Sequence, residues 1–278
     1  MRLEGKRALV TGAGRGIGRR IARALAGEGA RVALLARSRG QLEDAARELE
    51  QSGAACLVAV ADLASEAETR SAVASVLDSW GGVDILVNNA AVLGPVGPAH
   101  TLDPAAWLRT VQVNLGGCFL CCSLVLPGMI GRRSGKIINL SGGGAVDPRP
   151  NFSPYAASKA AVVRFTETLA AEVAAHRIDV NAISPGAIDT DMLREGIAAG
   201  EAAGDEAEEL RQIARQGGQD PERAAALAVH LASAATDGLT GRLISAQWDD
   251  WENLDRSGVT ETDLFTMRRI TPGREVRG

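Results

Sequence analysis

Tyr155 and Lys159 are the residues of this chain whose types and spacing best suit proton transfer. Tyr155 is the only tyrosine among the 278 residues, and Lys159 is one of three lysines. Residues four apart lie on one face of an α-helix, so the lysine ammonium can lie below the tyrosine ring and favour the phenolate over the phenol. The spacing predicts a proton donor and acceptor, although such a pair also arises by chance on surface helices.

A glycine-rich turn from Thr11 to Gly18 predicts a binding loop for a diphosphate. It follows an apolar run and opens an amphipathic segment. Glycines permit a tight turn and a close approach of the main chain to phosphate, and a helix N-terminus offers unpaired N–H groups and a positive dipole end. The position between a strand and a helix, so near the start of a βαβ unit, is that of a dinucleotide-binding loop rather than of an ordinary glycine turn.

The end of the second apolar run indicates which dinucleotide the loop prefers. An NAD-binding chain usually carries an acid there for the ribose 2′-hydroxyl, but this chain has Leu35-Ala36-Arg37-Ser38-Arg39. Arg37, together with Arg15 of the glycine loop, can pair with a 2′-phosphate, so NADP(H) is favoured over NAD(H). The alternative is that these arginines are ordinary solvated charges.

Short apolar runs without strict alternation recur along the chain, as is typical of strands buried on both faces. They cover residues 8–11, 32–35, 56–60, 85–87, 137–140, 180–183 and 239–245, with helical segments such as 17–28 and 41–51 between them. This order predicts an α/β fold, a single doubly wound Rossmann-type domain with a parallel seven-stranded sheet and helices on both faces. We expect that domain to cover residues 1–247, followed by a C-terminal extension over 248–278.

Composition limits the classes of partner and the compartment. A net charge of −4 and a pI near 5.5 give no general attraction to nucleic acid or to an anionic membrane. The cysteines, of which three lie between Asn114 and Leu126, have no disulfide-framework spacing and are interpreted as reduced core thiols rather than a metal or redox site. No apolar run is expected to span a membrane, and no signal peptide is expected ahead of the first strand, so the expected location is cytoplasmic.

The chain resembles the short-chain dehydrogenase/reductase family from about Gly5 to about Gln247. The matching motifs, in the family's order, are T-G-x-x-x-G-x-G at 11–18, an acid followed by leucine at Asp62-Leu63, N-N-A-G at 88–91 with Ala91 in the last place, Tyr155-x-x-x-Lys159, and P-G-x-x-x-T at 185–190. Asn114 lies where the family keeps a catalytic asparagine.

The resemblance implies an NADP(H)-dependent oxidoreductase that interconverts a ketone or aldehyde and an alcohol by hydride transfer, without a metal. Tyr155 would be the general acid or base, and Lys159 would lower the tyrosine pKa and hold the nicotinamide ribose. The implied catalytic residues are Asn114, Ser141, Tyr155 and Lys159. The implied cofactor-binding residues are Gly12, Gly14, Arg15, Gly16, Ile17, Gly18, Arg37, Asp62, Leu63, Asn89, Ala90, Tyr155, Lys159, Pro185, Gly186, Ile188 and Thr190. The helices near 107–129 and 155–176 resemble the family's subunit interface, which implies a homodimer or homotetramer.

One departure from the family pattern concerns the third catalytic side chain. The family keeps a serine thirteen residues before the tyrosine, and here that position is Gly142, with Ser141 one residue earlier. Either the glycine-rich turn shifts and places the Ser141 hydroxyl in the site, or no hydroxyl stands there. In the second case an enzyme would need a substitute donor or be slow, and the alternative function is a dinucleotide-binding regulator or scaffold with impaired catalysis.

Two further segments bear on the substrate, which the resemblance implies is a small carbonyl or alcohol compound. Residues 192–218 resemble the family's lid, with Gly196, Gly200 and Gly204 as possible hinges, or are simply an exposed helical hairpin. They contain no large aromatic residue. This composition favours a small or polar substrate such as a sugar, cyclitol or hydroxy acid. Gln247-Trp248-Asp249-Asp250-Trp251 opens the extension. This aromatic and acidic segment either lines the substrate site or packs on a neighbouring subunit.

Overall fold

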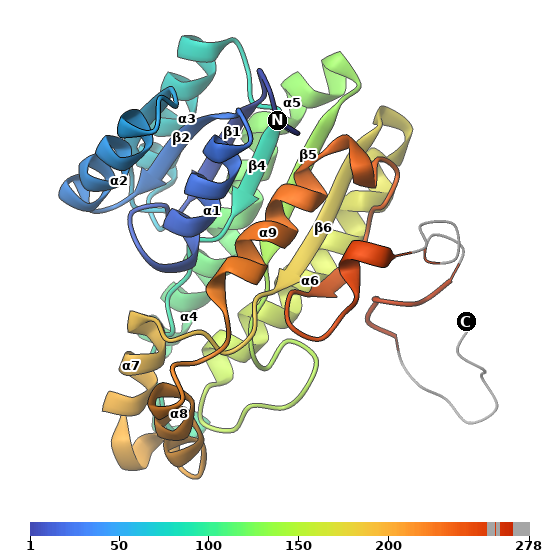
Figure 1. Cartoon of the computed structure of the whole chain (residues 1–278). Coiled ribbons are helices and arrows are strands. Elements are labelled where there is room, and N and C mark those ends of the chain that lie inside the picture. The colour runs from blue at the N-terminus through green and yellow to red at the C-terminus, as the bar shows by residue number, and fades with distance from the viewer. Residues whose placement is uncertain (255–258, 260–261, 269–278) are drawn as a thin grey trace.

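A parallel seven-stranded sheet forms the centre of the molecule in the computed structural model, which describes residues 1–254, 259 and 262–268 (Figure 1). The strand order is β3-β2-β1-β4-β5-β6-β7, and each neighbouring pair is parallel. The strands are β1 (Arg7–Thr11), β2 (Arg31–Ala36), β3 (Cys56–Val60), β4 (Ile85–Asn88), β5 (Gly135–Leu140), β6 (Ile178–Ser184) and β7 (Leu243–Ser245). The α/β fold with an all-parallel sheet of seven strands is thus confirmed.

Helices cover both faces of this sheet, and in Figure 1 α1 and α9 lie in front of it while α7 and α8 lie below. The α-helices are α1 (Gly16–Gly27), α2 (Arg39–Gln51), α3 (Glu66–Trp80), α4 (Pro104–Val111), α5 (Gly117–Arg132), α6 (Ser153–Val173), α7 (Asp191–Ala198), α8 (Glu206–Arg215) and α9 (Pro221–Ala232). The shorter turns are η1 (Ala99–Thr101), the π turn η2 (Gln112–Gly116), η3 (Ala174–His176), η4 (Gly200–Ala203), η5 (Ala234–Thr236) and η6 (Trp251–Asn253).

The core consists of two main layers, one on each face of the sheet. On one face, side chains of α1, α2 and α9, such as Leu25, Leu42 and Leu227, pack against the strands. On the other face the cluster includes Val73 of α3 and Leu169 of α6. Strands enclosed in this way are apolar on both sides, which explains why their sequences lack strict alternation.

The chain direction across the sheet reverses between β1 and β4. β1 pairs with β2 on one side and with β4 on the other, and the later strands continue outward from β4. In sheets of this kind the two loops at the reversal diverge and leave a crevice at the carboxyl ends of the strands. The fold therefore positions the glycine loop after β1 and the Asn88-Asn89 segment after β4 at the same crevice.

The strands expected from apolar runs are all present, and six of the seven begin and end within two residues of the expected bounds. The seventh is shorter than expected, because it begins at Leu243 rather than at Leu239. Gly238 and Gly241 have φ of +87° and +73°, a left-handed conformation that interrupts an extended strand. The Asn181 side chain instead binds this loop, donating to the Leu239 carbonyl at 2.7 Å.

One apolar stretch is longer than expected from the sequence. Residues Pro104–Arg132 run through α4, η2 and α5 and are long and apolar enough, by length and composition, to cross a membrane. The expectation that no run reaches that length is therefore wrong. Buried side chains of α5, including Cys121, Cys122 and Met129, pack in the core layer on one face of the sheet, so the fold itself accounts for much of this apolarity. Their burial also confirms the interpretation of these cysteines as core thiols.

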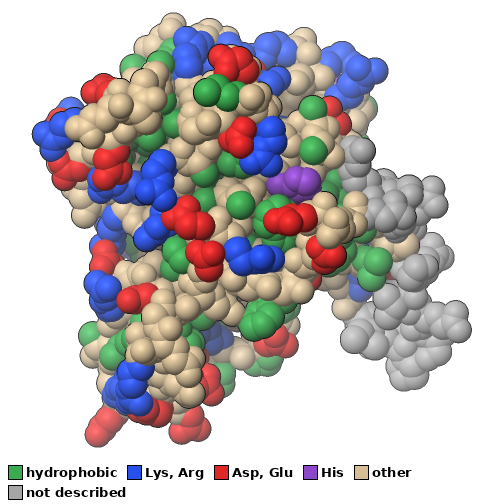
Figure 2. Space-filling model, in the orientation of Figure 1, with side chains coloured by type: hydrophobic (Ala, Val, Ile, Leu, Met, Phe, Trp, Pro, Cys, Tyr) green, Lys and Arg blue, Asp and Glu red, His purple; other side chains and the backbone are tan. Residues whose placement is uncertain are grey.

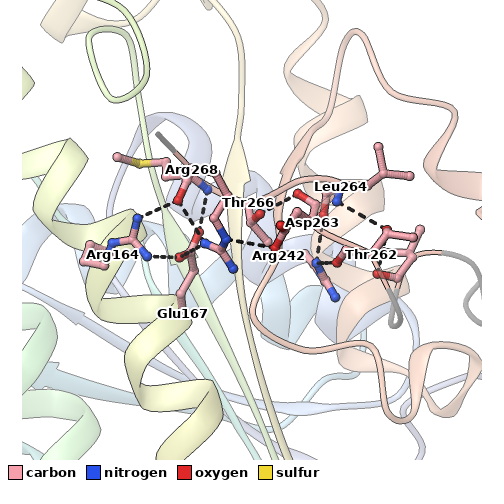
Figure 3. Close-up of polar contacts among 10 residues, drawn as sticks. Arg164, Glu167, Arg242, Thr262, Asp263, Leu264, Thr266 and Arg268 are labelled. Atoms are coloured by element: carbon pink, nitrogen blue, oxygen red, sulfur yellow. Dashed lines mark hydrogen bonds and ion pairs between the residues drawn. The ribbon is translucent and has the colours of Figure 1, made fainter. Parts of the chain in front are cut away.

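The part of the extension that the structure describes packs on α6 and on the outer edge of β7 (Figure 3). The Leu243 amide donates to the Phe265 carbonyl at 2.8 Å, and Arg242 donates to the Thr262 and Leu264 carbonyls. Glu167 of α6 accepts from the Met267 amide and from the Arg268 guanidinium. An edge strand exposes unpaired backbone groups, and this segment satisfies part of that edge. Residues 255–258, 260–261 and 269–278 lie outside the described part of the chain.

Charges of both signs are interspersed on the surface. On the face shown in Figure 2, Lys and Arg side chains alternate with Asp and Glu side chains. On α1, for example, Arg20 and Arg23 both pair with Glu222 of α9. Among the described residues of this face, charges of both signs therefore lie close together.

Candidate active site

A cavity of about 690 Å³ opens at the carboxyl ends of the strands, at the reversal between β1 and β4. It brings together most of the site residues expected from the sequence. Those that line it are Gly12, Gly14, Arg15, Gly16, Ile17, Arg37, Asp62, Leu63, Asn89, Ala90, Ser141, Tyr155, Lys159, Pro185 and Thr190. Gly18, Asn114, Gly186 and Ile188 are not among the residues that line it.

The glycine loop is packed so closely that a side chain would not fit at two of its positions. Gly12 has φ +66°, and a Cβ on it would lie 2.8 Å from the Asn89 side chain. A Cβ on Gly18 would lie 2.3 Å from the Gly12 carbonyl oxygen. Gly18 therefore supports the loop from behind, which explains why it does not line the cavity although its motif position is right.

The loop after β4 holds the glycine loop through short polar contacts. The Thr11 hydroxyl accepts hydrogen bonds from the Asn89 and Ala90 amides, both at 3.0 Å, and the Asn89 side chain donates to the Thr11 carbonyl at 2.9 Å. These contacts join two segments far apart in the sequence into one wall of the cavity.

Two hydrogen-bond donors hold the Asp62 carboxylate at the part of the cavity wall that follows β3. Its carboxylate accepts from the Ala64 amide at 2.9 Å and from the Arg109 guanidinium at 2.9 Å. The carboxylate is thus fixed at the end of β3, next to the cavity.

The two arginines expected at a 2′-phosphate differ in their surroundings. Arg15 forms an ion pair with Asp191, the first residue of α7, so a bridge links the glycine loop to the segment after β6. Arg37 is exposed, lines the cavity and forms no ion pair within the described part of the chain. Arg37 is therefore the guanidinium that has no competing carboxylate.

Tyr155 and Lys159 lie on the same side of α6 and both face the cavity, as their spacing predicts. The Lys159 ammonium lies 5.6 Å from the centre of the Tyr155 ring and donates to the Leu140 carbonyl at 2.7 Å. Burial raises the pKa of Tyr155 to about 12 and lowers the pKa of Lys159 to about 8. The pairing with Lys159 predicts a lowered tyrosine pKa, but the pKa of Tyr155 is raised instead. The reason is that desolvation disfavours the charged phenolate.

Asn114 supports the site without lining the cavity. It lies in the π turn η2, a local helix widening that is frequent at functional sites. Its side chain accepts from the Val92 amide at 2.8 Å and donates to the Ser158 hydroxyl at 2.9 Å. Ser158 in turn donates to the Tyr155 carbonyl at 2.7 Å. A continuous buried chain of contacts therefore connects η2 to the turn of α6 that carries Tyr155.

Gly142 lies against the Tyr155 hydroxyl. A Cβ on Gly142 would lie 2.3 Å from the Tyr155 Oη. The Ser141 hydroxyl is buried at the cavity wall, and it has no hydrogen-bond partner among the described residues. A buried hydroxyl without a partner is uncommon in proteins, so its position suits a group that occupies the cavity.

The segment after β6 forms the rim of the cavity. Gly186 has φ +90°, and the Gln219 side chain accepts from the Ala187 amide beside it at 2.7 Å. Ile188 is buried and pairs with Gly218 in an isolated antiparallel bridge. These contacts close the base of the 192–218 segment and leave Pro185 and Thr190 at the rim.

The 192–218 segment contains helices, as expected, but one of the three expected hinges is wrong. Gly196 lies inside α7, where a Cβ would be 2.8 Å from a Leu210 methyl group, so this glycine permits close packing of α7 on α8. Gly200 and Gly204 have φ of +57° and +61° and lie between the two helices.

Some residues that line the cavity belong to no sequence motif and were not predicted. These include Ser38, Gln41, Val92, Val113, Leu140, Asp191 and Met192. Most lie one to three residues beyond a recognisable motif or strand end, so the rule that ligands bind at the carboxyl ends of parallel strands would have found Val92 and Leu140. Trp248, expected to line the substrate site or pack, is 78% exposed and does not line the cavity, whereas Trp251 is buried against His230 and Arg223 of α9.

The residues present fit a nicotinamide dinucleotide. Glycines without side chains line the cavity where the loop after β1 meets it, a carboxylate is fixed after β3, and a hydroxyl without a partner among the described residues, a phenol and an ammonium line the same cavity. The cavity therefore combines a cradle for phosphates with a proton-handling group in one continuous space.

Comparison with known proteins yields consistent matches. A family model described as short chain dehydrogenase matches residues 6–199. The galactitol 2-dehydrogenase (L-tagatose-forming) of Cereibacter sphaeroides is 39% identical over 249 residues, which cover 88% of this chain and 94% of that protein. An NAD⁺-bound xylitol dehydrogenase superposes with a TM-score of 0.83 at 29% identity, covering 90% of this chain and all of its own. A gluconate 5-dehydrogenase from Burkholderia cenocepacia in complex with NADP and tartrate superposes with a TM-score of 0.78 at 34% identity, covering 88% and 94%.

Proposed function

The chain belongs to the short-chain dehydrogenase family, and from this membership we propose that it is an NADP(H)-dependent oxidoreductase that interconverts a ketone or aldehyde and an alcohol. The observation that carries the proposal is the common cavity of the glycine loop, Ser141, Tyr155 and Lys159. A dinucleotide held on that loop would extend its nicotinamide toward the phenol.

The chain's own residues supply binding, orientation and the proton. The bound nicotinamide supplies or accepts the hydride. Tyr155 gives its hydroxyl proton to the carbonyl oxygen in reduction and takes one from the alcohol in oxidation. Lys159, held by the Leu140 carbonyl, binds the ribose hydroxyls, and Ser141 offers its hydroxyl to the substrate oxygen. Asn114 keeps α6 in place through Ser158.

The preference for NADP(H) is supported by Arg37. A guanidinium at the cavity wall without a competing carboxylate suits a phosphate, which it can bind through two parallel hydrogen bonds. Related proteins bind NADP in some cases and NAD⁺ in others, so the preference has to be read from this chain's own residues.

The substrate class that we propose is a small polyol, sugar acid or hydroxy acid. The segment 192–218 carries no large aromatic side chain to stack on a flat ring system, and only Met192 of that segment lines the cavity. The relatives named above act, by their names, on a sugar alcohol or a sugar acid.

We further propose that the chain associates through α5 and α6. Phe119 of α5 is 56% exposed and makes an edge-to-face contact with Phe165 of α6 at 6.1 Å between ring centres. An exposed aromatic pair of this kind is typical of a buried interface core. Light scattering tests this, because a monomeric mass at micromolar concentration would contradict it.

The function is tested by following NADPH absorbance with a panel of ketones, and NADP⁺ reduction with the matching polyols and hydroxy acids. We expect turnover by the wild-type chain and its loss in Tyr155→Phe, with cofactor affinity retained. A regulator or scaffold would bind NADPH with no turnover of any substrate. That alternative is not favoured, because relatives that match nearly the whole chain are named dehydrogenases.

A further inference from the structure

Arg149 is a cation beside Tyr155 that no family motif includes. It lies in the loop between β5 and α6, and its side chain is 17% exposed. The guanidinium carbon lies 4.2 Å from the centre of the Phe152 ring and 5.6 Å from the centre of the Tyr155 ring. Contacts of this length between a guanidinium and aromatic rings are attractive. The loop therefore holds a positive charge against the ring that carries the proposed catalytic hydroxyl.

Glu206, the first residue of α8, fixes that guanidinium. Nε of Arg149 donates to the Glu206 Oε1 at 2.5 Å, Nη2 forms an ion pair with the same oxygen, and the Glu206 side chain is 19% exposed. The two residues are 57 positions apart. A charge-assisted hydrogen bond is stronger than one between neutral groups, so the segment 192–218 holds Arg149 in place beside the two rings.

We propose that Arg149 is a positioning residue for the reaction, whose charge, held by Glu206, favours the phenolate form of Tyr155. This rests on the proposed function, in which Tyr155 exchanges a proton with the substrate oxygen. The role differs from that of a side chain that touches the substrate, because Arg149 acts through Tyr155.

Two cations stand near the Tyr155 ring, and they keep their charge over different ranges of pH. Lys159 of α6 is on one side, with its ammonium 5.6 Å from the ring centre, and burial lowers its pKa to about 8. A guanidinium stays protonated throughout. Burial raises the pKa of Tyr155 to about 12, and the Arg149 charge opposes that rise. Glu206 of α8 is the carboxylate that pairs with Arg149, and Leu93, Leu193 and Leu210 are among the apolar neighbours of Tyr155.

The proposal accounts for one consequence of Gly142. Because that residue faces the Tyr155 hydroxyl, no side chain at position 142 donates a hydrogen bond to a developing phenolate. A nearby fixed charge stabilises an anion without such a bond, through an environment of reduced dielectric. Arg149 is the group in that position.

The single tyrosine of this chain makes the proposal measurable without turnover. Biosynthetic incorporation of 3,5-difluorotyrosine labels position 155 alone, and the ring fluorines lower the phenol pKa, which brings its ionisation toward the native pH range. A ¹⁹F NMR titration of the cofactor-free protein then follows one residue. The variants are Arg149→Met, Arg149→Lys and Glu206→Gln, with circular dichroism at each pH as the folding control.

We expect Arg149→Met to raise the midpoint by about one pH unit, and Arg149→Lys to raise it by less than half as much. Glu206→Gln keeps an acceptor oxygen but removes the opposing charge, so it should not raise the midpoint. The proposal is overturned if Arg149→Met leaves the midpoint unchanged or if Met and Lys raise it equally. It is also overturned if Glu206→Gln raises the midpoint as much as Arg149→Met does. Loss of the ion pair would then explain both shifts, without any effect of the Arg149 charge on Tyr155.

The outcome is separable from that of the proposed function, because no substrate is present in the titration. A shifted midpoint together with full activity of Tyr155→Phe would refute the role of Tyr155 and leave the electrostatic effect standing. If Tyr155→Phe is inactive and the midpoint does not move, the function holds and Arg149 has no part in it.

Discussion

A Cβ atom built on Gly142 would lie 2.3 Å from the Tyr155 hydroxyl oxygen, so the absence of a side chain at position 142 leaves the space that the tyrosine fills. Gly142, at the family's serine position, therefore has two effects. It supplies no hydroxyl, and it leaves the space in which the phenol lies.

Gly142→Ala is expected to destabilise the protein by about 1–3 kcal/mol, because the added methyl group must displace a buried ring. Gly143→Ala is the matched control, since a Cβ there would have its nearest neighbour at 3.6 Å. Chemical denaturation of both variants measures the difference. Equal stabilities would mean that the ring moves aside at little cost, contrary to this expectation.

Ser141→Ala is expected to lower kcat/KM by about two to three powers of ten if this hydroxyl binds the substrate oxygen. Stability should not fall, because the hydroxyl has no partner within the described part of the chain and its removal leaves no donor or acceptor unsatisfied. Steady-state kinetics and thermal denaturation together make the test. A normal rate would remove Ser141 from the proposed mechanism.

Arg37→Ala is expected to weaken NADPH binding by about tenfold or more and to leave NADH binding unchanged, because a charge-assisted contact with the 2′-phosphate is lost. Arg39→Ala is the control, since Arg39 pairs with Glu43 and does not line the cavity. Fluorescence titration of the wild type and both variants with each cofactor gives the six dissociation constants. A similar loss for both cofactors, or the same loss in the control, would argue against a 2′-phosphate contact.

Lys159→Met is expected to remove activity but to stabilise the free protein at pH 7. Burial lowers the Lys159 pKa from 10.5 to about 8, so between these values the unfolded chain binds more protons than the folded one, and the contribution of this group to stability rises with pH. Methionine removes the cost of burying the charge, and we expect a gain of about 2 kcal/mol at pH 7.

The gain in Lys159→Met should shrink toward pH 10, where the wild-type lysine is neutral in the fold. Urea denaturation of both proteins at the two pH values measures this dependence. A variant less stable than wild type at pH 7 would show that the contact of Lys159 with the Leu140 carbonyl outweighs the cost of burial.

Much of the fold was predictable because its signals are local. Apolar runs without alternation identified the buried strands, and the glycine loop marked the first strand-to-helix turn. The seventh strand was misplaced because its start depends on the left-handed backbone at Gly241 and on contacts with Asn181, which no short window contains. The apolar stretch 104–132 has the length of a membrane span, and only its packing against the sheet accounts for its burial in this fold.

The candidate site divides in the same way. The order of the motifs and the pairing of Tyr155 with Lys159 follow from the sequence, because residues four apart on a helix share a face whatever surrounds them. The folded chain was needed to show that Gly142 lies against the phenol, that burial raises the pKa of the phenol, and that Arg149 is held beside it by a carboxylate 57 residues away. These properties depend on the conformation of one turn and on the desolvation and charge that distant segments bring to it.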